Sequence, residues 1–125
     1  MTGIRSAGII AILLMAGLST IEAQTIGSSK YCPNDPPTQF SGRGTYYTSM
    51  NETPGTGNCA YAVGNYDPNY YAALNWSDYE NGLSCGACIA AHYNGKSVTV
   101  MVVDQCPSPC LVHQIDFSPQ AYGQL

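Results

Sequence analysis

Six cysteines constrain what this chain of 125 residues can fold into more than any other feature. All of them lie in the 102 residues after residue 23, a length near the small end for a self-sufficient hydrophobic core. An even number of cysteines in a small exported domain is typical of three disulfides. Alternatively, Cys85 and Cys88 form a metal or redox CxxC site, but no second pair or suitably spaced histidines accompany them. We therefore expect no metal or cofactor, and disulfides formed by Cys32, Cys59, Cys85, Cys88, Cys106 and Cys110.

The first 23 residues follow the order of a secretory signal peptide. Arg5 precedes an apolar run over residues 9–18, and small or polar residues lead to Ala23. The run has ten residues, whereas a helix needs roughly 20 to span a bilayer, which argues against a retained membrane anchor. We predict a signal peptide over 1–23, cleavage between Ala23 and Gln24, and an extracellular protein.

The predicted mature chain has few charges. It has three basic residues, Lys30, Arg43 and Lys96, and seven acidic residues, so its net charge is −4. This charge argues against nucleic acid or an anionic membrane as partner. Ten tyrosines favour a neutral, hydroxyl-rich ligand instead, and we expect a monomer. Asn51 and Asn75 begin N-glycosylation sequons, which predict a glycoprotein in a eukaryotic secretory pathway.

The first half of the mature chain has weak periodicity. Residues 24–41 contain three prolines and predict an irregular arm before a domain over 42–125. The β-branched and aromatic residues 44–48 predict a strand. Residues 70–75 are expected to form a short helical turn.

The second half carries clearer patterns. Two apolar segments, 88–93 and 97–103, flank Asn94-Gly95, a dipeptide preferred in two-residue hairpin turns. Residues 115–117 predict a short strand, and Ser118-Pro119 predicts the cap and first residue of a helix. The predicted domain is mostly β with short helices.

Several segments resemble the first domain of the expansin family, in the same order along the chain. They are residues 44–47, 57–59, 81–88, 95–100, 103–107 and 116–122. The layout is most similar to that of the loosenins and other single-domain members. The resemblance implies a six-stranded double-psi β-barrel with a polysaccharide-binding groove. Family members usually continue past this helix into a closing strand, so either the barrel lacks its last strand or it closes in another way.

The resemblance also implies site residues. Asp116 is expected to be the acid of the groove, with Asp104, Thr45 and Tyr46 beside it. The related family-45 endoglucanases have a catalytic base where this chain has Thr48, and a threonine hydroxyl cannot serve as one at ordinary pH. We therefore expect a secreted protein that binds and loosens cell-wall polysaccharide, such as cellulose, chitin or a related β-glycan, without hydrolysis.

Each assignment has an alternative. Asp104 can instead bind loop amides, Asp116 can stabilise the following helix, and Thr45 can be a packing residue. His113 is expected in an exposed loop. The aromatic residues form either a sugar-binding platform or a cover for the core; they are Tyr66, Tyr70, Tyr71, Trp76 and Tyr79.

Two other functions remain open. One is a lytic transglycosylase or weak endoglucanase that uses Asp116, although a histidine of one such class corresponds to Asn75 here. The other is a barwin-like defence or protease-inhibitor module. The resemblance pairs Cys59 with Cys85 and leaves the pairing of the other four cysteines open.

Overall fold

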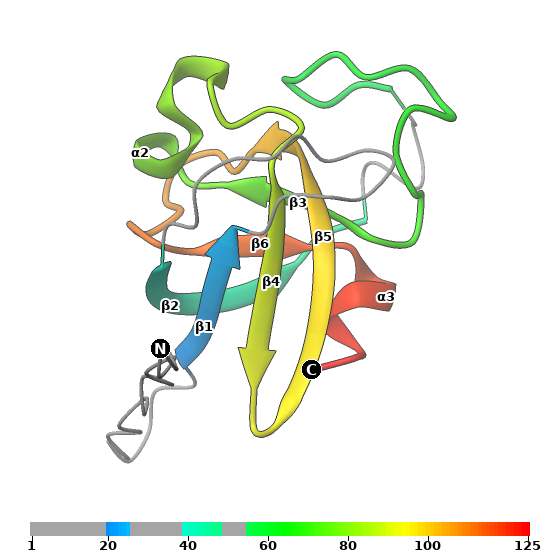
Figure 1. Cartoon of the computed structure of the whole chain (residues 1–125). Helices are drawn as coiled ribbons and strands as arrows, with labels where there is room; N and C mark the ends of the chain where they lie inside the picture. The colour runs from blue at the N-terminus through cyan, green and yellow to red at the C-terminus, as the bar shows by residue number, and fades with distance from the viewer. Residues whose placement is uncertain (1–19, 26–38, 49–54) are drawn as a thin grey trace, which may run out of the picture.

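The computed structural model describes residues 20–25, 39–48 and 55–125. Six strands pair in the order β1-β2-β6-β3-β5-β4 and close into a barrel (Figure 1). The expected mostly β, six-stranded barrel with short helices is therefore confirmed. The elements are β1 (Thr20–Thr25), β2 (Gln39–Tyr46), β3 (Tyr71–Leu74), α2 (Trp76–Tyr79), a 3₁₀ turn (Glu80–Gly82), β4 (Cys88–Tyr93), β5 (Lys96–Gln105), β6 (Ile115–Phe117) and α3 (Pro119–Tyr122).

The hairpin of β4 and β5 forms around Asn94-Gly95 as predicted. Both turn residues have positive φ, 47° at Asn94 and 76° at Gly95, as a two-residue hairpin turn of this dipeptide requires. Strand β5 is buried on both faces over residues 100–103, which explains why that part of its sequence is continuously apolar. The short strand β6 and the Ser118-capped helix α3 also form where they were predicted.

Strand β1 closes the barrel. It pairs antiparallel with β2 on one side and with β4 on the other, so of the two alternatives left open above, the barrel closes in another way. The irregular arm expected over 24–41 is wrong at both of its described ends, because residues 24–25 belong to β1 and 39–41 to β2. Both strands gain backbone hydrogen bonds from partners distant in sequence, which local periodicity does not reveal.

Strand β3 replaces the helical turn that was predicted over residues 70–75. All four of its residues are buried, and it lies between β5, to which it is parallel, and β6, to which it is antiparallel. A strand covered on both faces has no alternation of apolar and polar residues. Helix α2 follows directly, with Asn75 as its N-cap.

The apolar side chains form two groups on opposite faces of the sheet. The outer tyrosine cluster contains Tyr66, Tyr71, Cys88, Met101 and Val103, with Tyr47 and Tyr61 packed against it. The interior core fills the barrel and consists of Ile21, Ala72, Leu74, Tyr79, Ala87, Ile89, Ala91, Val98, Val100, Val102, Ile115, Phe117 and Ala121.

Two disulfides have both partners in the described residues. Cys59 is bonded to Cys85, as the resemblance implied, and Cys106 to Cys110. Cys88 is also disulfide-bonded, while Cys32 lies outside the described residues. Cys85 and Cys88 are thus not bonded to each other, which argues against a CxxC redox pair. Within the described residues, no helix has the length and apolar character needed to span a bilayer.

Candidate functional site

The strand register aligns two aspartates across the outer face of the sheet. Thr45 on β2 is opposite Asp116 on β6, Asp116 is opposite Ala73 on β3, and Ala73 is opposite Asp104 on β5. Side chains of directly opposite residues lie on the same face. We call these four residues the acidic row. Because neighbouring strands lie 4.7–4.9 Å apart, the Cα atoms of the two aspartates are about 10 Å apart.

A β-bulge places Asp104 in this row. Ala72 is opposite Val102, but the next residue, Ala73, is opposite Asp104, so Val103 is an extra residue in β5. Strict alternation would put Val103 and Asp104 on opposite faces. The extra residue instead leaves Val103 in the outer tyrosine cluster and brings Asp104 to the same outer face.

Asp116 is held by a chain of hydrogen bonds. The amide Nε2 of Gln114 donates to Thr45 Oγ1 over 3.0 Å, and the Thr45 hydroxyl donates to Asp116 Oδ1. The other carboxyl oxygen, Oδ2, lies 3.3 Å from the Sγ atom of Cys106, which is in a disulfide and has no proton to donate. The alternative role for Asp116 at α3 is weakened, because Ser118 caps that helix.

Burial raises the pKa of Asp116 above its usual value, and the nearby Arg43 guanidinium opposes this shift only in part. A raised pKa favours the neutral carboxyl group. Since Thr45 donates to Oδ1, Oδ2 is the oxygen left for a ligand. It accepts a hydrogen bond when Asp116 is ionised and can donate one when Asp116 is protonated.

Asp104 has a different environment. Its Oδ1 atom accepts hydrogen bonds from the backbone N–H of Asn58, over 2.7 Å, and of Gln105, over 2.8 Å. This is the loop-binding role considered above as an alternative. The bonds fix the segment around residues 57–59 against the end of β5.

Tyr47 belongs to the site, although the sequence analysis did not assign it there. It lies two residues after Thr45, and its ring meets Tyr71 edge-on with ring centroids 5.4 Å apart. Burial, and then the Asp104 carboxylate, raise the pKa of Tyr47 far above its usual value, with a smaller contribution from Asp116. The buried Tyr47 hydroxyl has no hydrogen-bond partner among the described residues. Alternation from Thr45 along β2 is the sequence pattern that would have found it.

The other predicted residues are not gathered in the row. Tyr46 lies on the opposite face of β2 from Thr45 and packs against Tyr122 of α3, with ring centroids 5.3 Å apart. Trp76 begins α2 with 65 % of its surface exposed. Tyr79 is buried in the interior core, and its hydroxyl lies 3.5 Å from Cys85 Sγ. Thr48 is exposed after the end of β2.

The choice between a sugar platform and a core cover is thereby resolved for most of the aromatic residues. Tyr66, Tyr71 and Tyr79 are buried, so neither face of their rings is open to a sugar. Tyr70 is partly buried against the interior core. Of the five, Trp76 alone presents a largely exposed ring.

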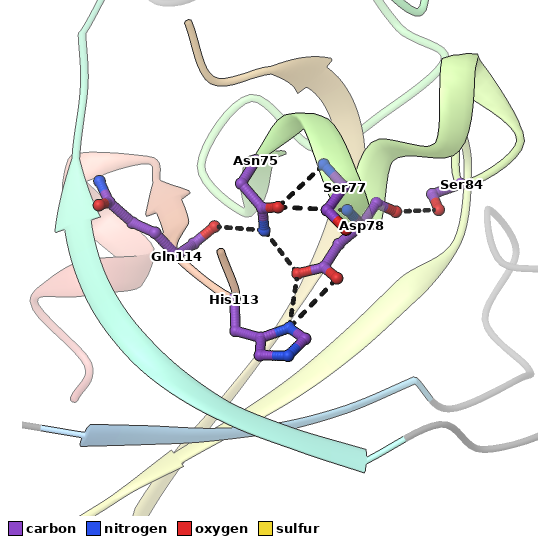
Figure 2. Close-up of polar contacts among 6 residues, drawn as sticks. All are labelled: Asn75, Ser77, Asp78, Ser84, His113 and Gln114. Atoms are coloured by element: carbon purple, nitrogen blue, oxygen red, sulfur yellow. Dashed lines mark hydrogen bonds and ion pairs between the residues drawn. The ribbon is translucent and has the colours of Figure 1, made fainter. Parts of the chain in front are cut away.

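A polar cluster surrounds Asn75, which is fully buried. Its Oδ1 accepts from the backbone N–H groups of Ser77 and Asp78, and its Nδ2 donates to Asp78 Oδ2 and to the carbonyl of Gln114 (Figure 2). A glycan on Asn75 would have to displace these bonds, so the structure argues against the sequon predicted there. Asn51, the other predicted glycosylation site, lies outside the described residues.

His113 lies at the exposed edge of this cluster. As expected for an exposed loop residue, it has 46 % of its side chain accessible, and its Nδ1 lies 3.1 Å from Asp78 Oδ2. Its ring also stacks on Phe40. Gln114, the next residue, connects the cluster to the acidic row through its bond to Thr45.

Together these features define a disulfide-bonded β-barrel protein with a half-buried acid on the outer face of its sheet. No protein-family model matches the chain, and no solved structure matches it. Two curated proteins of Dictyostelium discoideum do match. Expansin-like protein 1 is 34% identical over 110 residues, which cover 81% of this chain and 37% of the relative. Expansin-like protein 2 is 33% identical over 92 residues, which cover 67% and 22%.

The chain therefore belongs to the expansin-like proteins. It spans 37% of the length of the first of these relatives and 22% of the second. The matches thus concern one part of longer proteins.

Proposed function

We propose that this chain is a secreted domain that binds β-linked cell-wall polysaccharide along the acidic row and separates polymer chains without hydrolysing them. The observation that carries the proposal is the unequal state of the two aspartates. Asp116 has a raised pKa and an Oδ2 oxygen with no hydrogen-bond donor in the described residues. Asp104 is already bonded to two backbone amides.

A glycan strand suits the hydrogen-bonding groups that the row leaves unused. Sugar hydroxyl groups both donate and accept, so one of them can pair with Asp116 Oδ2 in either protonation state. The Tyr47 hydroxyl also has no partner among the described residues; because it is buried, a sugar hydroxyl would reach it only after the side chains around it moved. A buried hydroxyl without a partner is unfavourable, so its pairing would add to binding. The exposed ring of Trp76 offers a surface for stacking.

Hydrolysis needs more than the row provides. A glycosidase uses one carboxyl group as acid and a second as base or nucleophile. Asp104 holds the backbone of Asn58 and Gln105 through Oδ1, which gives it a structural role, and Thr48 cannot act as a general base. Contacts between the protein and a glycan chain would then compete with the contacts between glycan chains, and the polymer would loosen without being cut.

A second candidate is a lytic enzyme that uses Asp116 alone. One observation favours it: a carboxyl group with a raised pKa is the usual general acid of glycoside cleavage. The two candidates differ in whether soluble sugar ends appear.

The test uses the secreted full chain with cellulose, xyloglucan, chitin and peptidoglycan. Pull-down, loss of mechanical strength and released reducing ends are measured separately. We expect binding and weakening with at least one polymer and no reducing ends. Asp116→Asn should reduce binding by about tenfold, the effect of losing one hydrogen bond to the ligand.

The matched control is Asp67→Asn, which makes the same chemical change at an exposed loop residue whose Oδ1 accepts from Asn69 N. It should bind as the wild type does. Reducing ends that disappear with Asp116→Asn would establish the lytic alternative. Absence of binding to all four polymers would refute both.

A further inference from the structure

The predicted export-cleavage point cuts through strand β1. In the structure Ala23 is opposite Phe40 of β2 and Ala91 of β4, and Gln24 is opposite Gln39 and Ala90. Cleavage between Ala23 and Gln24 would leave only the last two residues of the six-residue strand. The closed barrel and this cleavage point are therefore incompatible.

The part that would be lost is anchored in the core. Ile21 is 6% exposed and belongs to the interior core. A Cβ atom on Gly44 would lie 1.9 Å from Ile21 Cδ1, so Gly44 makes room for this side chain. Without β1, the edges of β2 and β4 would both present unpaired backbone groups, which favours aggregation.

The residues just before β1 provide another cleavage site. Signal peptidases require small residues at the last and third-last positions before the cut. Gly17 and Ser19 occupy those positions relative to the Ser19–Thr20 bond, directly after the apolar run. For a cut after Ala23 the third-last position is Ile21, which is large.

We propose that export processing hydrolyses the Ser19–Thr20 bond and that β1 remains in the mature protein as the closing strand of the barrel. The reaction consumes one water and leaves a carboxylate on Ser19 and a free amine on Thr20. This inference rests on the secretion included in the proposed function. It does not depend on polysaccharide binding.

The direct test is secretion of the full chain from a yeast host, followed by N-terminal sequencing and intact-mass measurement. We expect the secreted protein to begin at Thr20. A start at Gln24, or retention of residues 1–19, would overturn the inference while leaving the polysaccharide assays to judge the proposed function. Absence of the protein from the medium would refute both the inference and the proposed secretion.

Two further variants test whether β1 supports the fold. Ile21→Gln should lower the melting temperature of the secreted protein by roughly 10 °C or more, because it places a polar side chain in the buried core while keeping a large residue at the third-last position before Gln24. Thr20→Ala, at the exposed neighbouring residue, should leave it within about 2 °C of the wild type. If the mature chain started at Gln24, both variants would yield the wild-type protein and the same melting temperature.

Discussion

The cluster around Asn75 and the acidic row are neighbouring polar regions that differ in how completely their buried polar groups are hydrogen-bonded. The Asn75 amide makes four hydrogen bonds in full burial. In the row, the buried Tyr47 hydroxyl has no partner among the described residues, and burial keeps the pKa of Asp116 raised. Buried polar groups in proteins are nearly always paired. The difference separates a region that holds the fold from the one to which the proposed function assigns the glycan.

Gln114 joins the two regions. Its carbonyl accepts from Asn75, while its side chain accepts from the backbone N–H of Leu111 and donates to Thr45. The satisfied cluster thus orients the hydroxyl that binds Asp116. A binding site is held in position by neighbours whose own bonds are complete.

The largest expected effect is on stability, from Asn75→Ala. The change removes the cap of α2, worth about 1 kcal/mol, and leaves buried partners unpaired at about 1–3 kcal/mol. We expect the melting temperature to fall by roughly 10 °C or more, measured by circular dichroism. Asn65→Ala, at an exposed loop residue, is the control and should change little. Equal stability of the two variants would contradict a structural role for the cluster.

An intermediate effect is expected on binding, from Tyr47→Phe. The variant keeps the ring against Tyr71 and removes only the unpaired hydroxyl, so stability should stay the same or rise by up to about 1 kcal/mol. Affinity for the bound polymer should fall about three- to tenfold, as measured by depletion isotherms. Tyr122→Phe, on the other face of the sheet, should alter neither quantity. A destabilised Tyr47→Phe with unchanged affinity would assign the hydroxyl to the fold.

The smallest effect is on the pH dependence of stability. Because burial raises the pKa of Asp116, the folded chain binds this proton more tightly than the unfolded chain. The resulting stability is complete below the unfolded pKa and is lost as pH rises through the folded pKa. The melting temperature of Asp116→Asn should therefore equal that of the wild type in acid and exceed it at neutral pH. Between these conditions, the melting temperature of the variant should depend less on pH than that of the wild type. A steeper loss of stability toward acid in Asp116→Asn than in the wild type would contradict the raised pKa.

Local patterns in the sequence predicted the elements that local physics determines. The Asn94-Gly95 hairpin, strand β6 and the capped helix α3 each depend on residues adjacent in sequence. Strand β3 could not be found this way, because its Tyr-Ala-Ala-Leu sequence is buried on both faces and has no alternation. Alanine and leucine also favour helix. Strand β1 was missed because its two partners are distant in sequence and because an export segment had been assigned to its residues.

The site was predictable only in part for a similar reason. Ordered motifs placed Thr45 beside Asp116, and the structure brings them into contact. Asn75 was interpreted as a glycosylation sequon, although an asparagine two residues before a serine also fits a helix cap, and burial decides between the two. The side of the sheet on which Tyr46 and Tyr47 lie depends on strand register, which the sequence alone did not reveal.

The bulge in β5 makes the site depend on backbone geometry as well as on residue types. If Val103 were deleted, Asp104 would follow Val102 directly and would still be opposite Ala73 on the outer face. With the same residues but no bulge, Val103 would be opposite Ala73, and Asp104 would be opposite Leu74 on the inner face. In alignments of such barrels, a one-residue gap at Val103 is therefore compatible with the same site, whereas an aspartate aligned without a gap lies on the outer face only if its strand carries the bulge.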